Sequence, residues 1–111
     1  MEGEPETAYS VAIWRTRASY EEALISAWEA LARWTIRRQQ GVQAMRLLRD
    51  DEAPQRLIAV GIWRSGEDVA RWQETPEYKA FMMEVRLLCE EQEERHMVLV
   101  GEVILSAEAN G

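Results

Sequence analysis

The stretch GIWRSGEDVARWQETPEYKAF, residues 61–81, constrains the fold of this chain more than any other segment. It starts with the end of an apolar strand at Trp63 and passes through Ser65, a residue type common at helix caps, into a helical segment. A second helix starts at Thr75 and Pro76, because proline is favoured in the first turn of a helix. The stretch therefore predicts a strand that leads directly into a long helical element with a bend.

Four segments have the alternation of residue types that is typical of β-strands. They are residues 8–16, 42–49, 56–63 and 96–106. The acidic, proline-containing loop between the second and third segments predicts a hairpin. The third and fourth segments carry apolar residues at both alternating sets of positions, which indicates that both faces of these strands are covered.

Two helical segments lie between the predicted strands. Helical spacing of apolar residues predicts the first helix over about residues 20–39, with Ser19 and Glu22 as a capping box and Gly41 as a left-handed stop. The second helical segment follows the strand-end tryptophan. The glutamate-rich residues 90–94 are interpreted as its solvated end.

The element order is strand, helix, strand, strand, helix, strand, which right-handed crossovers arrange as a ferredoxin-like βαββαβ fold. This is an α+β fold with a four-stranded antiparallel sheet and both helical segments on one face. With 111 residues we expect a single domain over 8–106, a disordered N-terminal tail at 1–7 and a C-terminal tail at 107–111. The bare sheet face is apolar, so we expect a homodimer that buries it, a dimeric α/β barrel.

Charge and cysteine content exclude several classes of partner. The formal net charge of −7 repels a phosphate backbone, so we expect no nucleic-acid partner. Cys89 is the only cysteine, which rules out an internal disulfide and favours a reduced, buried thiol in a cytoplasmic protein. No apolar run reaches the roughly 18 residues of a membrane span, and the acidic start does not resemble a signal peptide. We therefore expect no membrane partner.

Two motifs carry a resemblance to a known family. The strand-end tryptophan is followed by a capped turn in Trp63-Arg64-Ser65-Gly66-Glu67-Asp68, and the helix restarts at Thr75-Pro76-Glu77-Tyr78. Over about residues 8–105 the chain resembles the antibiotic biosynthesis monooxygenase family of dimeric α/β-barrel domains. The resemblance implies the fold more strongly than the chemistry, because the superfamily includes oxygenases, haem-degrading enzymes, isomerases and domains of unknown activity.

The cofactor-free anthrone oxygenases of this family imply one function for the chain. Such enzymes bind a planar phenolic substrate between helices and sheet, remove a proton, and let the electron-rich carbanion reduce oxygen. By resemblance, this chain is a cofactor-independent monooxygenase that acts on an aromatic or polyketide-like compound. The implied catalytic residues are Trp63, as an indole hydrogen-bond donor, with Tyr78 and Arg86 assisting. The implied substrate-binding residues are Trp72, Phe81 and Met82.

Other interpretations stay open. The family oxygenases are associated with a strand asparagine near the tryptophan, whereas the only asparagine of this chain is Asn110. Because no obvious base is present, the alternative is a non-catalytic dimer that binds an apolar small molecule or serves as an accessory domain. Haem degradation is disfavoured, because His96 lies outside the second helix. His96 and Cys89 do not have the spacing of a metal-ligand cluster, so we expect neither a metal nor a cofactor.

Overall fold

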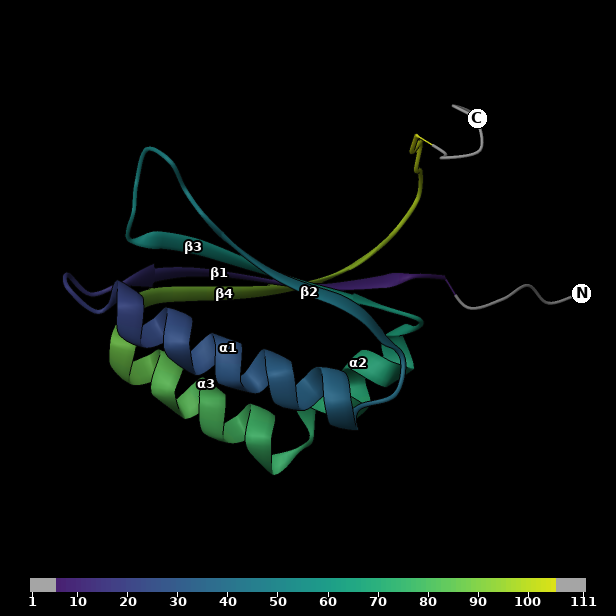
Figure 1. Cartoon of the computed structure of the whole chain (residues 1–111), viewed down its shortest axis with the longest axis horizontal. Helices are drawn as coiled ribbons and strands as arrows, with labels where there is room; N and C mark the ends of the chain where they lie inside the picture. The colour runs from purple at the N-terminus through teal and green to yellow at the C-terminus, as the bar shows by residue number, and fades with distance from the viewer. Residues whose placement is uncertain (1–5, 106–111) are drawn as a thin grey trace, which may run out of the picture.

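The computed structural model describes residues 6–105 of the chain. Of the predicted N-terminal tail it includes residues 6 and 7, and the predicted C-terminal tail lies outside the described residues. Figure 1 shows the helices packed against one sheet. The elements are β1 (Ala8–Thr16), α1 (Glu21–Arg38), β2 (Val42–Arg49), β3 (Arg56–Trp63), α2 (Gly66–Gln73), α3 (Pro76–Leu88) and β4 (Cys89–Val98).

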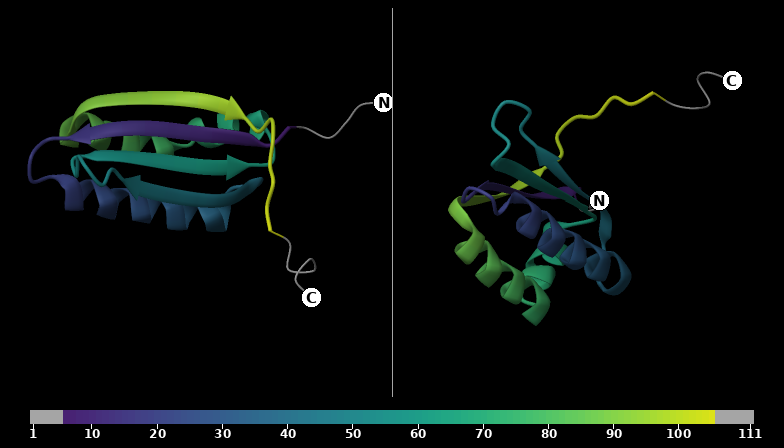
Figure 2. Two further views of the ribbon diagram at one scale, coloured as in Figure 1. Left: turned by 90° about the horizontal axis from the view of Figure 1, so that it is seen from above. Right: turned by 60° about the vertical axis from the view of Figure 1, so that its left-hand side comes forward.

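The four strands form one antiparallel sheet in the order β2-β3-β1-β4. All three helices cover the same face of this sheet and leave the opposite face open within residues 6–105 (Figure 1, Figure 2). This arrangement confirms the predicted ferredoxin-like α+β fold, and the bounds of β1, β2 and β3 agree with the prediction. None of the helices within residues 6–105 combines the length and the apolar character that a membrane crossing requires.

The hydrophobic core lies between the helices and the covered face of the sheet. Its most deeply buried apolar side chains are Trp63 and Leu57 from β3, Leu24 from α1 and Val85 from α3. Each of these side chains contributes about 1.5–3 kcal/mol through removal of apolar surface from water. Burial of these side chains therefore holds the helices against the sheet.

The predicted bend between α2 and α3 is confirmed, and both helices have side-chain caps. The Ser65 hydroxyl accepts a hydrogen bond from the Asp68 amide at 3.3 Å. The Thr75 hydroxyl accepts one from the Tyr78 amide at 3.2 Å, with Pro76 in the first turn of α3. These caps satisfy amides that the helix itself leaves unpaired, and so fix where each helix begins.

The start of α1 differs from the prediction. The helix begins after Tyr20, which makes no side-chain capping hydrogen bond, so the predicted capping box of Ser19 and Glu22 is wrong. Ser19 instead adopts φ +75°, a left-handed conformation that turns the chain just before the helix. At the other end, Gly41 has φ +88°, a left-handed conformation as predicted, but α1 already ends at Arg38, followed by Gln39 in an extended conformation.

Asp68 joins the start of α2 to the loop before β2. Its carboxylate is buried and accepts hydrogen bonds from Ser65 at 3.0 Å, Arg64 at 3.2 Å and Arg71 at 2.8 Å. Burial alone would raise the pKa of Asp68, but these donors outweigh it and hold the pKa below the usual value. A Cβ atom on Gly41 would overlap the Asp68 carboxylate, so only glycine fits at that position.

The last strand differs from the prediction. β4 spans Cys89–Val98, whereas the apolar alternation predicted a strand over residues 96–106. Residues 90–94, interpreted as a solvated helix end, therefore belong to the strand. Backbone pairing with β1 outweighs the side-chain pattern here, because β4 is an edge strand whose charged side chains reach water. The pairing ends where the Leu99 amide donates to the Thr7 carbonyl at 2.9 Å.

The apolar residues that follow β4 are exposed to solvent and do not pair with the sheet. Beyond Leu99 the chain rises on the side of the sheet opposite the helices (Figure 1). Val100 and Val103 are 91% and 98% exposed, and Ile104 and Leu105 are also exposed. The open sheet face beside them is apolar too, with half-buried side chains at Val11, Ile13, Ile58, Val60 and Ile62. So much apolar surface on one side of a chain is typical of an interaction site.

Candidate active site

A cavity lies between the sheet and the helices. Its floor is a row of one residue from each strand, because the register pairs Met45 with Gly61, Gly61 with Ser10, and Ser10 with His96. The cavity and its mouth together have an empty volume of about 450 Å³. The centre of a water molecule can occupy only about 40 Å³ of this volume. It is therefore a narrow slot. Its helical wall comes chiefly from Trp28, Leu31, Trp72, Gln73, Tyr78, Phe81 and Met82.

Trp63 is linked to this cavity by a hydrogen bond to Ser10. The Trp63 side chain is fully buried, and its indole N–H donates a hydrogen bond to the Ser10 Oγ at 3.1 Å. A Cβ atom on Gly61 would lie 2.5 Å from Ser10 Oγ and 2.7 Å from Trp63 Nε1. Glycine at this position thus leaves the space in which the hydrogen bond forms. Because Ser10 accepts from Trp63, its own hydroxyl hydrogen remains available for an acceptor in the cavity.

Aromatic rings beside the cavity contact one another at tilted and edge-on angles, from Trp63, which lies behind the wall, to Trp72 and Tyr78. The ring centroids of Trp63 and Trp72 are 4.9 Å apart, and those of Trp72 and Tyr78 are 4.6 Å apart. The Trp72 indole N–H donates to the Thr35 hydroxyl at 2.9 Å, which fixes the ring against α1. Phe81 continues the wall and packs edge-on against Trp14 with centroids 5.5 Å apart. Aromatic pairs at such distances are attractive, so this wall is rigid.

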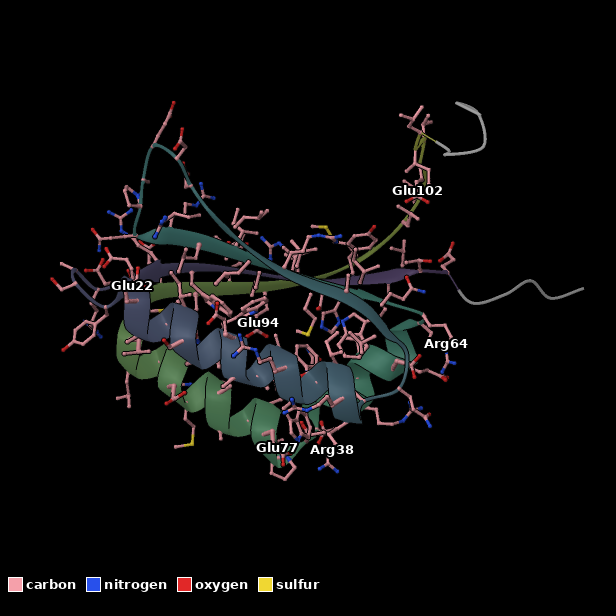
Figure 3. The ribbon with its side chains drawn as sticks, viewed as in Figure 1. Glu22, Arg38, Arg64, Glu77, Glu94 and Glu102 are labelled. Carbon is pink, nitrogen blue, oxygen red and sulfur yellow. The ribbon has the colours of Figure 1, made fainter. Side chains whose placement is uncertain are left out.

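Tyr78 faces a carboxylate from β4. Its hydroxyl donates a hydrogen bond to Glu94 Oε1 at 3.3 Å, and Figure 3 shows Glu94 between the sheet and the helices. Burial and the negative charge of Glu94 raise the pKa of Tyr78 far above its usual value. The phenol therefore keeps its proton at neutral pH, and Tyr78 can serve as a hydrogen-bond donor but not as a base.

His96 lies on the same face of β4 as Glu94. Its Nε2 atom is 3.1 Å from the Nε2 atom of Gln73, which comes from α2. Sequence reasoning missed Ser10 although it placed β1 correctly, and it missed Glu94 and His96 because it ended the helix too late and began the last strand only at His96. Correct placement of β4 was the missing information: in the observed register, alternate residues of β4 face the helices.

The structure places the predicted site residues in three different surroundings. Trp63 is buried behind Ser10 and does not line the cavity. Arg86 is exposed on α3, where it lines a shallow groove at the surface between α3 and β4 instead of the cavity. The remaining four all line the cavity: Trp72, Tyr78, Phe81 and Met82.

Other reactive groups lie outside this arrangement. Cys89 is a buried free cysteine at the junction of α3 and β4. Burial raises the pKa of its thiol to about 11, so Cys89 is protonated and a poor nucleophile at neutral pH. Within residues 6–105, histidine, cysteine and carboxylate side chains form no group of three or more that could hold a metal ion.

Sequence comparison identifies the family. A model of the antibiotic biosynthesis monooxygenase domain matches residues 7–84, which is more than half of the chain. The chain belongs to the antibiotic biosynthesis monooxygenase family. The resemblance carried by the tryptophan turn after β3 and by the helix restart is thereby confirmed. A search of curated proteins gave no match.

Solved structures share the fold at low sequence identity. SnoaB from Streptomyces nogalater, described as a cofactor-independent oxygenase, has a TM-score of 0.80 and 16% identity, covering 88% of this chain and 97% of its own. A conserved Methanosarcina mazei protein has a TM-score of 0.78 and 13% identity, covering 84% and 92%. A Pseudomonas aeruginosa protein has a TM-score of 0.77 and 17% identity, covering 90% and 100%. At these identities the similarity establishes the fold of the family domain and not its reaction.

Proposed function

We propose that the chain is a cofactor-independent monooxygenase that oxidises a planar aromatic or polyketide-like compound in the cavity between helices and sheet. One observation carries the proposal: the Trp63 N–H donates to the Ser10 hydroxyl, and Ser10 opens onto an aromatic-walled cavity. A donor aimed into a partly buried, apolar space stabilises an anion far better than the same donor in water. Membership of a monooxygenase family and the fold shared with SnoaB support the same reaction class.

The reaction requires an anion-stabilising group, and Ser10 supplies it. Loss of a proton from an activated methylene leaves a carbanion whose charge spreads to a ring oxygen. The Ser10 hydroxyl donates to that oxygen, and the Trp63 N–H polarises Ser10 from behind. The carbanion gives its electrons to dioxygen, one oxygen atom forms the new carbonyl group, and the other leaves as water with the two methylene hydrogens. Ser10 thus takes the place of the strand asparagine that this chain lacks near Trp63.

The aromatic wall orients the substrate. A flat ring slides between the sheet floor and the faces of Trp72 and Tyr78, and its entry widens the slot. Met82 lines the cavity on α3, and its unbranched thioether chain can change rotamer to make room. The single O–H of Tyr78 already donates to Glu94, so Tyr78 contributes its ring to the wall and no donor to the substrate. Arg86 lies outside the cavity and takes no part in this proposal.

Oxygen uptake with a panel of anthrones and hydroquinones tests the function. We expect uptake by the wild type, and a loss in kcat of about 100-fold in both Ser10→Ala and Trp63→Phe, the usual effect of removing an anion-stabilising donor. The double variant should lose little more than either single variant, because Trp63 acts through Ser10. Ser26→Ala, on the exposed face of α1, is the matched control and should keep full activity.

Two results contradict the proposal in different ways. Aromatic ligands that bind tightly without any oxygen uptake would support the non-catalytic binding domain instead. Oxygen uptake that is unchanged in Ser10→Ala would mean that the protein is an oxygenase but that a group other than Ser10 stabilises the substrate anion.

We also propose that two copies pair through the open sheet face. The support is the apolar surface formed by β1 and β3 on that face, together with the exposed residues that follow β4. Light scattering at micromolar concentration should give twice the 12.9 kDa mass of the chain. Val60→Lys, which places a charge in the middle of that face, should give the single-chain mass. A wild-type protein of single-chain mass would rule out the pairing.

A further inference from the structure

We propose that His96 is the general base of the site, the group that takes the proton from the substrate; this inference rests on the function proposed above. The backbone register places His96 on β4 directly opposite Ser10 on β1, and both side chains line the cavity. Directly opposed residues on neighbouring strands have Cβ atoms about 4.5–5.5 Å apart. The proposed base therefore stands beside the proposed anion donor, one strand away.

The side chain of Gln73 contacts the imidazole ring of His96, with its amide nitrogen 3.1 Å from His96 Nε2. In the tautomer that carries the ring proton on Nδ1, Nε2 accepts from this amide and its lone pair is directed at Gln73. A general base requires this tautomer with the lone pair of Nε2 free for the substrate. Gln73 is a positioning residue that the substrate displaces from Nε2.

Three titratable residues share the cavity lining with His96: Glu94, Arg95 and Tyr78. Tyr78 stays protonated and donates to Glu94, so Tyr78 does not compete as the proton acceptor. Arg95 and His96 are successive residues of one strand, so their side chains leave β4 on opposite faces. The Glu94 carboxylate lies two residues before His96, on the same face of β4.

The proton step balances without a cofactor. The methylene C–H bond breaks, its electron pair stays on the substrate, and its proton moves to His96 Nε2. The negative charge reaches the ring oxygen at Ser10, and dioxygen then accepts the electrons. A C–O bond forms, and the imidazolium returns its proton to the outer oxygen of the resulting peroxide. Loss of the second methylene proton then breaks the O–O bond, forms the carbonyl group and releases water that carries both hydrogens, so His96 is neutral again after each turnover.

Proton exchange without oxygen isolates the role of His96. Anthrone is incubated anaerobically in D₂O with the protein, and loss of its methylene hydrogen signal is followed by NMR. We expect His96→Asn and His96→Gln to slow this exchange about 100-fold or more, the usual contribution of a general base. Glu90→Gln, an exposed position on the same strand outside the cavity lining, should leave exchange unchanged.

The pH profile separates a base from a residue that only shapes the cavity. The wild-type exchange rate should fall as the pH drops, because the protonated imidazole has no lone pair. The His96 variants should lose this acid limb, whereas Trp63→Phe should keep it at a lower rate. Because His96 is the only histidine of the chain, His96 is the only imidazole whose protonation can produce the acid limb of the pH profile. Added imidazole should restore part of the exchange in His96→Asn.

The possible outcomes distinguish this inference from the proposed function. Exchange that depends on His96 without oxygen uptake by the wild type would support the base and overturn the oxygenase. Exchange and uptake that persist unchanged in the His96 variants would overturn the base and leave the oxygenase intact. A wild-type protein that does not accelerate exchange would overturn the assignment of His96.

Discussion

Replacing Gly61 by alanine should reduce oxygen uptake about 100-fold, as severely as removal of the Ser10 hydroxyl itself. The added Cβ atom would lie 2.5 Å from Ser10 Oγ and 2.7 Å from Trp63 Nε1, closer than either atom allows. Both partners must shift, and the hydrogen bond between them breaks. The overcrowding should also lower the free energy of unfolding by about 1–3 kcal/mol, measured by urea denaturation.

Gly66→Ala is the control for this experiment. No atom lies within 4 Å of a Cβ atom at Gly66, which is exposed at the start of α2. The control should therefore keep its activity and gain up to about 1 kcal/mol of stability, since alanine is the better helix former. Gly61→Ala with wild-type uptake would show that the contact between Trp63 and Ser10 is irrelevant to turnover.

Replacing Trp63 by alanine should lower the free energy of unfolding by about 3–5 kcal/mol, a large part of the stability of a domain this size. Trp63 is fully buried, and its ring stacks on Trp72 with the centroids 4.9 Å apart. Alanine would leave a cavity at the junction of β3 and α2 and would remove the donor to Ser10. Chemical denaturation followed by circular dichroism measures the loss.

Trp63→Phe separates the packing role from the hydrogen bond. Phenylalanine keeps most of the ring volume, so its stability loss should be clearly smaller than that of alanine, while both variants lose the donor to Ser10. Equal stability losses in the two variants would indicate that the indole hydrogen bond, and not the ring, holds the junction together. A loss under about 1 kcal/mol for Trp63→Ala would contradict its place at the centre of the core.

The sequence predicted those parts of the fold whose signals are local. The Ser65 and Thr75 caps act within three residues, and both helix starts follow from them. The hairpin of β2 and β3 closes over a short loop with recognisable turn residues. Family motifs around Trp63 then identified the fold, because they lie in the same segment as these caps. These local signals were therefore sufficient to predict the topology of the fold.

The site depends on pairing between distant segments, which the sequence does not display. The run from Glu90 to Glu94 has no apolar alternation, so nothing in it indicates a strand. Only pairing with β1 makes it one, and that pairing brings His96 to Ser10. The sequence analysis found no obvious base, and His96 is proposed as one because this pairing places it opposite Ser10. Arg86 carries a positive charge that suits an anionic intermediate, but it lies on a face of α3 outside the cavity. The sequence does not reveal this, because an error of one residue in the helical pattern changes the face to which a residue is assigned.

The cavity floor is completed only by the last strand of the chain. β1, β2 and β3 leave the ribosome first and already hold Ser10, Gly61 and Trp63. The neighbour that β1 needs on its other side is β4, the last strand to be made, and contacts between such distant segments form late. Until β4 docks, the floor of the cavity lacks its fourth residue, His96. Docking of the final strand thus completes the sheet and the cavity floor together.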